Sequence, residues 1–153
     1  MATNVRVSKG DLFGTKDGVL VNTGSREARY WSRLPGVFNK RFGVSRFISE
    51  HGRKDLYYQQ DVIDRETGRR RDVITLIVKE TEGVYVDEKY LTKLLYDLRE
   101  FCEKNDIHHL VMPKICCGVH GCRWNNVNKL LRGVFDGSDV RVTVKYLENG
   151  VTH

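Results

Sequence analysis

The sequence contains few cysteines, no long apolar run and no internal repeat, and each shortage excludes a class of protein. Four cysteines among 153 residues are too few and too clustered for a disulfide scaffold, so we expect reduced thiols. No window approaches the roughly 18 consecutive apolar residues of a membrane span. Residues 1–9 lack the apolar run of a signal peptide, and the absence of repeats excludes a solenoid. The sequence therefore predicts a soluble, cytoplasmic (intracellular) protein that does not contact a membrane.

The spacing typical of metal sites is also missing. Cys116, Cys117, His120 and Cys122 can each ligate zinc, but structural zinc sites usually draw their second pair of ligands from a distant segment. Adjacent cysteines seldom both reach one ion. A zinc site is therefore the lesser alternative, and we expect neither a metal nor a cofactor.

The charge balance favours anionic partners. The chain has 26 Lys and Arg against 20 Asp and Glu, a net charge of +6, which suits nucleotides, phosphates or nucleic acid. Part of the excess lies in Arg69, Arg70 and Arg71, after Thr67-Gly68. This segment is more typical of a solvated hairpin turn than of a nucleic-acid footprint. Charge alone does not choose among these partners.

Apolar residues recur along the chain with two different periods. Alternation and short apolar runs predict strands at 5–9, 18–22, 56–63, 72–78, 107–115 and 140–147. Spacings of three and four residues predict helices around 37–42, at 87–104 and at 124–135. The chain has the length of one domain, so we predict a single α/β domain over residues 1–153. A mixed central sheet would carry helices on both faces.

Three loops are expected at the carboxyl ends of these strands. They span 10–13, 22–33 and 116–121. Sheets of this kind bind ligands in the crevice beyond those ends, so candidate site residues are expected there.

Three segments of the chain, taken in order, resemble the macrodomain family. They are Lys9-Gly10-Asp11-Leu12-Phe13, Leu20-Val21-Asn22-Thr23, and Met112-Pro113-Lys114-Ile115-Cys116-Cys117-Gly118-Val119 before Trp124. The resemblance spans almost the whole chain and is closest to the small branch that removes ADP-ribose from protein carboxylates or DNA bases. It implies a three-layer sandwich with a cleft for ADP-ribose or a nucleotide that contains it.

The resemblance also assigns ligand contacts. Asp11 would accept a hydrogen bond from the adenine amino group, because a carboxylate only accepts, and Leu12 would pack beside the base. Gly118 and the backbone of Val119 would cradle the diphosphate, since glycine lets N–H groups approach phosphate oxygens. The alternatives are ordinary turns at Asp11 and Gly118. The full set of candidate ligand-binding residues is Asp11, Leu12, Asn22, Ser25, Trp31, Arg33, Cys117, Gly118, Val119 and His120.

The loop after the second strand departs from the family. On a gap-free alignment, Trp31 and Arg33 stand where the family has glycines, and Cys116 stands where it has another. The added side chains imply a rebuilt loop, a narrowed distal pocket or a different ligand. Arg33 or Arg29 could offer forked donors to a phosphate, and Trp31 could stack on a ring. Alternatively, Trp31 packs into the core and the arginines face water.

The hydrolase branch uses a lysine at the end of a central strand and an aspartate in a later loop. Lys79 matches the lysine, which can act as a nucleophile on the anomeric carbon, through a Schiff base, or as a cation near phosphate. His120 stands at the aspartate position. A histidine can be a general acid or base near neutral pH but supplies no fixed negative charge. Lys79 thus lacks its expected partner.

Three functions remain open, in order of preference. The first is a module that reads or sequesters ADP-ribose or an NAD-derived signal, as a viral or phage protein would. The second is an enzyme that removes ADP-ribose from a protein or nucleic acid, or that dephosphorylates ADP-ribose phosphate, with Lys79 and His120 as its catalytic groups. The third is a nucleic-acid-binding protein that uses Arg69, Arg70 and Arg71. This last function is the least favoured, because no recognition-helix or aromatic-rich strand pattern accompanies the arginines.

Overall fold

The computed structural model describes residues 3–28, 31–118 and 121–147. Within these ranges, six strands form one mixed sheet in the order β1-β6-β5-β2-β4-β3. Neighbouring strands are parallel, except that β3 runs antiparallel to β4. The strands are β1 (Val5–Lys9), β2 (Val19–Ser25), β3 (Leu56–Ile63), β4 (Arg70–Lys79), β5 (His109–Met112) and β6 (Arg141–Tyr146).

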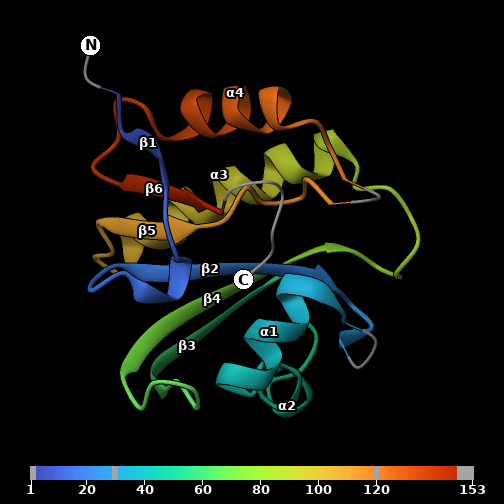
Figure 1. Cartoon of the computed structure of the whole chain (residues 1–153). Coiled ribbons are helices and arrows are strands. Elements are labelled where there is room, and N and C mark those ends of the chain that lie inside the picture. The colour runs from blue at the N-terminus through green and yellow to red at the C-terminus, as the bar shows by residue number, and fades with distance from the viewer. Residues whose placement is uncertain (1–2, 29–30, 119–120, 148–153) are drawn as a thin grey trace.

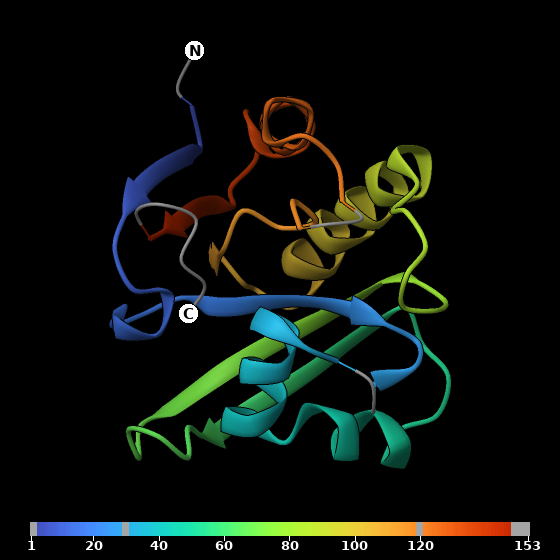
Figure 2. The same cartoon turned by 45° about the vertical axis from the view of Figure 1, so that its right-hand side comes forward.

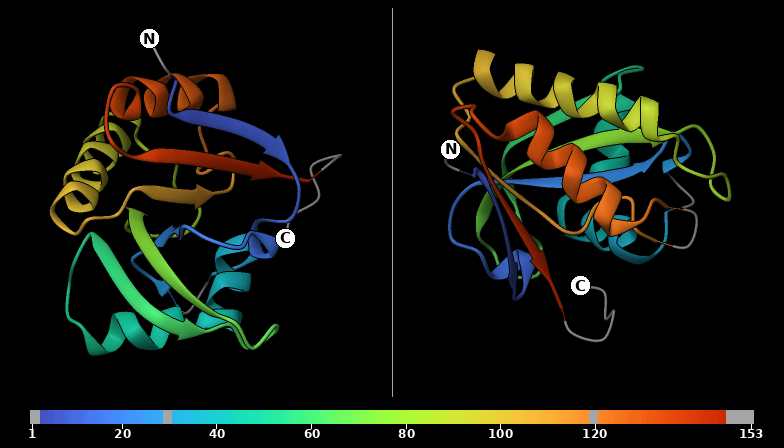
Figure 3. Two further views of the ribbon diagram at one scale, coloured as in Figure 1. Left: turned by 90° about the vertical axis from the view of Figure 1, so that its left-hand side faces the viewer. Right: turned by 90° about the horizontal axis from the view of Figure 1, so that it is seen from above.

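Helices cover both faces of this sheet. α3 (Glu88–Lys104) and α4 (Trp124–Phe135) lie side by side on one face (Figures 1 and 3). α1 (Arg33–Phe42) and α2 (Val44–Glu50) cover the other face (Figure 2), and a short 3-10 helix, η1 (Leu12–Gly14), follows β1. The predicted three-layer α/β sandwich is therefore confirmed. None of the helices in the described ranges is long and apolar enough to cross a membrane.

The central strands are buried on both sides because helices cover both faces of the sheet. Successive side chains of each strand alternate between these two faces. In β2, Val21 joins the core cluster that α3 and α4 cover, whereas Leu20 joins the smaller cluster that α1 covers. The longest helix, α3, buries one stripe and is capped by Asp87, whose side chain accepts a hydrogen bond from Lys89 N at 3.1 Å. Each buried leucine contributes roughly 2 kcal/mol. The buried residues of α3 are Leu91, Leu94, Leu95, Leu98 and Cys102.

All four cysteines are free thiols. Burial raises the pKa of the Cys102 thiol to about 12, which keeps it neutral and unreactive.

Several elements differ from those predicted, and α1 begins at Arg33 rather than near 37. β2 continues through Thr23, Gly24 and Ser25, which were expected in a loop, because these residues pair with the end of β4. β5 ends at Met112 rather than near 115, since Pro113 has no N–H for the ladder. The short helix α2 was not predicted. It begins directly after Gly43, whose φ of 63° ends α1 and lets the chain turn.

The interpretation of Arg69–Arg71 as a solvated turn is wrong for Arg71. Arg69 and Arg70 are exposed, but Arg71 lies within β4 and is only 6% exposed. Its guanidinium donates to Thr15 O at 2.9 Å and Oγ1 at 3.1 Å, and to the carbonyl oxygens of Asp17 and Gly18. The alternation of β4 turns this side chain inward, where it holds the loop before β2 against the sheet.

We predict that Arg71→Met lowers the free energy of unfolding by about 3 kcal/mol, because the loop carbonyls lose a charged donor in a buried place. Arg70→Met is the matched control. Its exposed side chain makes one ion pair, with Asp61 at 3.4 Å, worth less than about 1 kcal/mol. Urea unfolding of both variants measures the difference, and equal losses would contradict the bracing role of Arg71.

Candidate functional site

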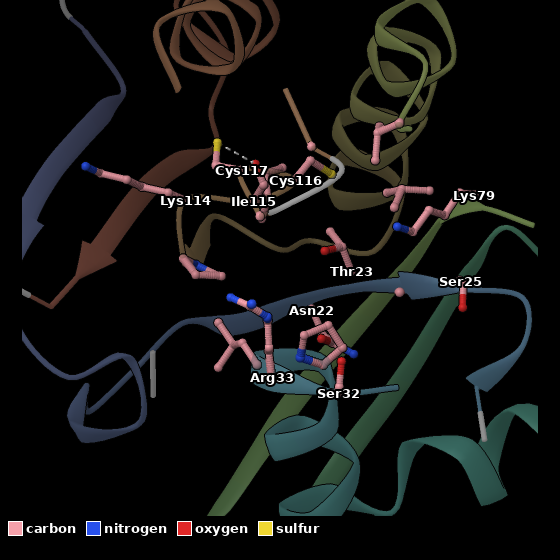
Figure 4. A pocket seen from close by; sticks show the side chains of 18 of the residues that line it. Asn22, Thr23, Ser25, Ser32, Arg33, Lys79, Lys114, Ile115, Cys116 and Cys117 are labelled. Atoms are coloured by element: carbon pink, nitrogen blue, oxygen red, sulfur yellow. Dashed lines mark hydrogen bonds between the residues drawn. The ribbon is translucent and has the colours of Figure 1, made fainter. Parts of the chain in front are cut away.

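A cavity of about 460 Å³ opens at the carboxyl edge of the sheet. β2 leads to α1 on one face and β5 leads to α4 on the other, so the two connections diverge and leave a crevice between them. Figure 4 shows Arg33 on the α1 side and the Lys114–Cys117 segment on the opposite side. The lining comes from residues 22–25, 32–35, 78–79, 113–118 and 145–147, with Glu82, Val86 and Gly121.

The charged side chains that line the cavity are predominantly cationic. Its described charged residues are Arg33, Lys79, Lys114 and Lys145, with Glu82 as the single carboxylate. Nζ of Lys114 lies 4.5 Å from the centre of the Tyr146 ring, which fixes this cation by a cation–π contact. A concave wall of this sign attracts an anionic ligand.

The end of β2 supplies two buried polar side chains, Asn22 and Ser25, both of which are candidate ligand-binding residues. Asn22 is 1% exposed and donates from Nδ2 to Thr75 Oγ1 at 3.3 Å. Ser25 is fully buried and donates from Oγ to Glu82 Oε1 at 3.2 Å. Both residues line the cavity. Their side chains are therefore fixed by partners on β4 and on the loop that follows it.

Trp31 packs against β2 and is not among the lining residues. Its ring lies against Gly24, where a Cβ atom would overlap the indole, and Nε1 donates to Ser25 O at 2.9 Å. The ring also contacts the smaller core cluster. The structure therefore favours the packing alternative for Trp31 over stacking on a ligand, and this packing requires a glycine at 24.

Arg33 and Cys116 both have left-handed backbones, with φ of 55° and 58°. The family resemblance places glycines at these two positions, and glycine adopts this conformation most readily. A side chain there costs roughly 1 kcal/mol or more. Arg33 is exposed and lines the cavity on the α1 side (Figure 4). Burial raises the pKa of the Cys116 thiol, which keeps it neutral.

Lys79 lies at the end of β4 and has a carboxylate partner that the sequence interpretation missed. Its Nζ donates to Val84 O at 3.2 Å and lies 3.6 Å from Glu82 Oε2. The aspartate that the resemblance expects is still absent from the sequence, but Lys79 has a carboxylate neighbour on another loop. The sequence did contain one indication of this contact. Glu82 follows the strand-end residue Lys79 by three positions, a spacing at which a tight turn brings two side chains together.

The loop after β5 folds back on itself beside the cavity. Cys122 N donates to Cys116 O at 2.6 Å, and Gly121 approaches the Cys116 carbonyl so closely that a Cβ atom would overlap it. The candidate ligand-binding residues Cys117 and Gly118 line the cavity. The predicted site residues Val119 and His120, like Arg29, lie outside the described residues. Among those that are described, no three His, Cys, Asp or Glu side chains are grouped to hold a metal ion.

Asp11 and Leu12 are not part of the lining. Oδ1 of Asp11 accepts a hydrogen bond from Phe13 N at 3.1 Å, which starts η1, so the turn-stabilising alternative is present. Leu12 is fully buried in the smaller core cluster, and its side chain exposes no surface to a ligand. Gly10 N donates to Tyr146 O at 2.9 Å, which places Asp11 next to the end of the cavity that Tyr146 lines.

Comparison with family models finds none that matches the chain. Two curated proteins do match. The chain is 31% identical over 140 residues to "ADP-ribose glycohydrolase OARD1" of Bos taurus, covering 89% of this chain and 87% of that protein. The protein of the same description from Homo sapiens is 30% identical over 140 residues, with the same coverage.

Solved structures share the fold at low sequence identity. The macrodomain of Mycobacterium tuberculosis DarG superposes with a TM-score of 0.77 at 16% identity, over 94% of this chain and 98% of that one. Thermosipho africanus DarTG, solved in complex with ADP-ribose, gives 0.79 at 15% identity over 98% of this chain and 43% of that one. The similarity to the curated proteins and the shared sandwich lead to one conclusion, that this chain belongs to the macrodomain family.

Proposed function

We propose that the cavity binds ADP-ribose, or a nucleotide that contains it, and that the protein acts as a reader or sequestering module for this group. The observation that carries the proposal is the cationic lining of a 460 Å³ cavity at the carboxyl edge of the sheet. Cavities of this size hold small-molecule ligands, and a diphosphate needs cations and N–H donors. A structural neighbour, Thermosipho africanus DarTG, was solved with ADP-ribose bound.

The lining residues suit a diphosphate between two walls. Arg33 offers forked donors from the start of α1, and Lys114 offers a point charge from the loop after β5. Gly118 lines the same cavity and has open space at its Cβ position, so a phosphate oxygen can approach its backbone. In this arrangement the adenosine end points toward Tyr146 and Asp11, and the terminal ribose toward Lys79.

Hydrolysis is the second candidate. Lys79, Glu82 and Ser25 form a connected polar group at one end of the cavity, and the curated relatives are described as ADP-ribose glycohydrolases. A substrate of this activity would be an ADP-ribosylated protein or nucleic acid, and ADP-ribose phosphate is the corresponding phosphatase substrate. The hypothesis that Arg69–Arg71 bind nucleic acid loses support. Arg69 and Arg71 donate to loop carbonyls, and Arg70 pairs with Asp61.

We predict that calorimetric titration with ADP-ribose gives a dissociation constant in the micromolar range. Raising the salt concentration should weaken binding, since part of the affinity comes from charges on the diphosphate. Mass analysis of the recovered ligand tests whether ADP-ribose itself is altered. Absence of binding below millimolar concentration would remove the proposed function.

Arg33→Ala should raise the dissociation constant of ADP-ribose by roughly 10- to 150-fold, because a charge-assisted contact is worth roughly 1.5–3 kcal/mol. Lys40→Ala is the matched control, since Lys40 is an exposed cation on the same helix and does not line the cavity. The same titration serves both variants. An equal effect of the two would mean that only net charge matters.

If the protein is an enzyme, Lys79→Ala and His120→Ala should each slow release of ADP-ribose from a modified peptide by about 100-fold or more. Affinity for free ADP-ribose should change far less, because neither substitution removes the diphosphate contacts. Unchanged rates in either variant would remove that residue from the catalytic roles, and a wild-type protein that binds without turnover is a reader.

A further inference from the structure

Lys79 and Glu82 form a pair at the wall of the cavity. The two charged groups are 3.6 Å apart, with the lysine side chain 15% exposed and the glutamate side chain 38% exposed. Glu82 uses its two carboxylate oxygens differently. Oε2 faces the ammonium group, while Oε1 accepts a hydrogen bond from Ser25 Oγ at 3.2 Å. The hydrogen bond from Ser25 thus orients the Glu82 carboxylate so that its second oxygen faces the Lys79 ammonium group.

The backbone fixes all three groups. Ser25 and Lys79 are direct partners in the parallel ladder between β2 and β4. Nζ of Lys79 also donates to Val84 O at 3.2 Å, so the lysine bridges the loop from which Glu82 projects. The Lys79–Glu82 pair is therefore held by β2, by β4 and by the loop after β4. Side chains held in this way need to move little when a ligand binds.

We infer that Glu82 is the acidic partner that positions Lys79 and exchanges a proton with it during release of ADP-ribose, an inference that rests on the hydrolytic form of the proposed function. The resemblance expects such a carboxylate in the loop after β5, where this chain has His120. Glu82 reaches the same lysine from the loop after β4. It is also the only carboxylate among the described residues that line the cavity.

For a substrate that carries ADP-ribose on a carboxylate, the reaction balances in two steps. Glu82 takes a proton from the Lys79 ammonium group, and the freed nitrogen lone pair forms a bond to the anomeric carbon. The bond from this carbon to the ester oxygen breaks, its electron pair leaves with the carboxylate, and that carboxylate takes the proton from Glu82. Water then adds to the anomeric carbon, the C–N pair returns to nitrogen, and a proton of the water restores the ammonium group.

The test measures the release of ADP-ribose from a glutamate-linked ADP-ribosyl peptide. An ADP-ribosylated oligonucleotide is the second substrate. Glu82→Gln should lower kcat for release about 100-fold, while the dissociation constant of free ADP-ribose stays within about threefold of wild type because the diphosphate contacts remain. Lys79→Met combined with Glu82→Gln should be no slower than Lys79→Met alone, since groups that act as a unit are not additive. Sodium formate should restore part of the turnover of Glu82→Ala, which a purely structural role would not allow.

Glu80→Gln is the matched control, because the Glu80 carboxylate binds Arg26 and Arg53 outside the cavity and the variant should keep full turnover. Unchanged or faster release by Glu82→Gln, additive losses in the double variant, or no formate effect would each overturn the inference. Wild-type protein that binds ADP-ribose but releases it from neither probe would overturn it as well, and the binding function would stand. Failure to bind ADP-ribose at all would instead remove the proposed function.

Discussion

The junction between the carboxyl ends of β2 and β4 positions the polar groups at one end of the cavity. Beyond the last ladder pair, Arg26 N donates to Lys79 O at 2.9 Å. On the outer side, the Arg26 guanidinium binds Glu80 at 2.9 Å and Asp55 at 2.7 Å, and this hydrogen bond holds the pKa of the Asp55 carboxyl below its usual range. On the inner side the same junction directs Ser25 and Lys79 to the cavity. The register between β2 and β4 therefore positions two groups of side chains. One is the surface ion network of Arg26, and the other is the candidate catalytic group that contains Lys79.

Among the described residues, four that are not glycine have a left-handed backbone: Arg33 and Cys116 beside the cavity, and Asp61 and Asp106 away from it. Arg33 and Cys116 keep a left-handed conformation on opposite walls, and strain of this kind persists only where the surroundings over-determine the chain. Packing of Trp31 on Gly24 anchors the segment before Arg33, and the contact of Gly121 with the Cys116 carbonyl anchors the other loop. At both positions the chain follows the left-handed path that glycine adopts most readily, and a side chain projects from it.

The sequence predicted the strands, the long helices and the layer order, because these follow from the period of apolar residues. It failed where tertiary partners override local preference. Thr23-Gly24-Ser25 has the composition of a turn, but pairing with β4 keeps it in a strand. Arg71 belongs to a basic run, yet strand alternation buries it. Only the spacing of three residues from Lys79 pointed to Glu82, and its hydrogen bond from Ser25, which is 57 residues away in the chain, could not be predicted from local sequence.

The distribution of charge explains how a carboxylate can share a cavity with a diphosphate. Isolated, Glu82 would repel an anionic ligand, but its partner Lys79 cancels its charge locally. In Figure 4 Lys79 lies at one end of the cavity and Lys114 at the other. Arg33, Lys114 and Lys145 are then the cations left to meet a diphosphate. A bound ligand brings the cavity close to neutrality without breaking the Lys79–Glu82 pair, so binding and proton exchange can use separate charges in one site.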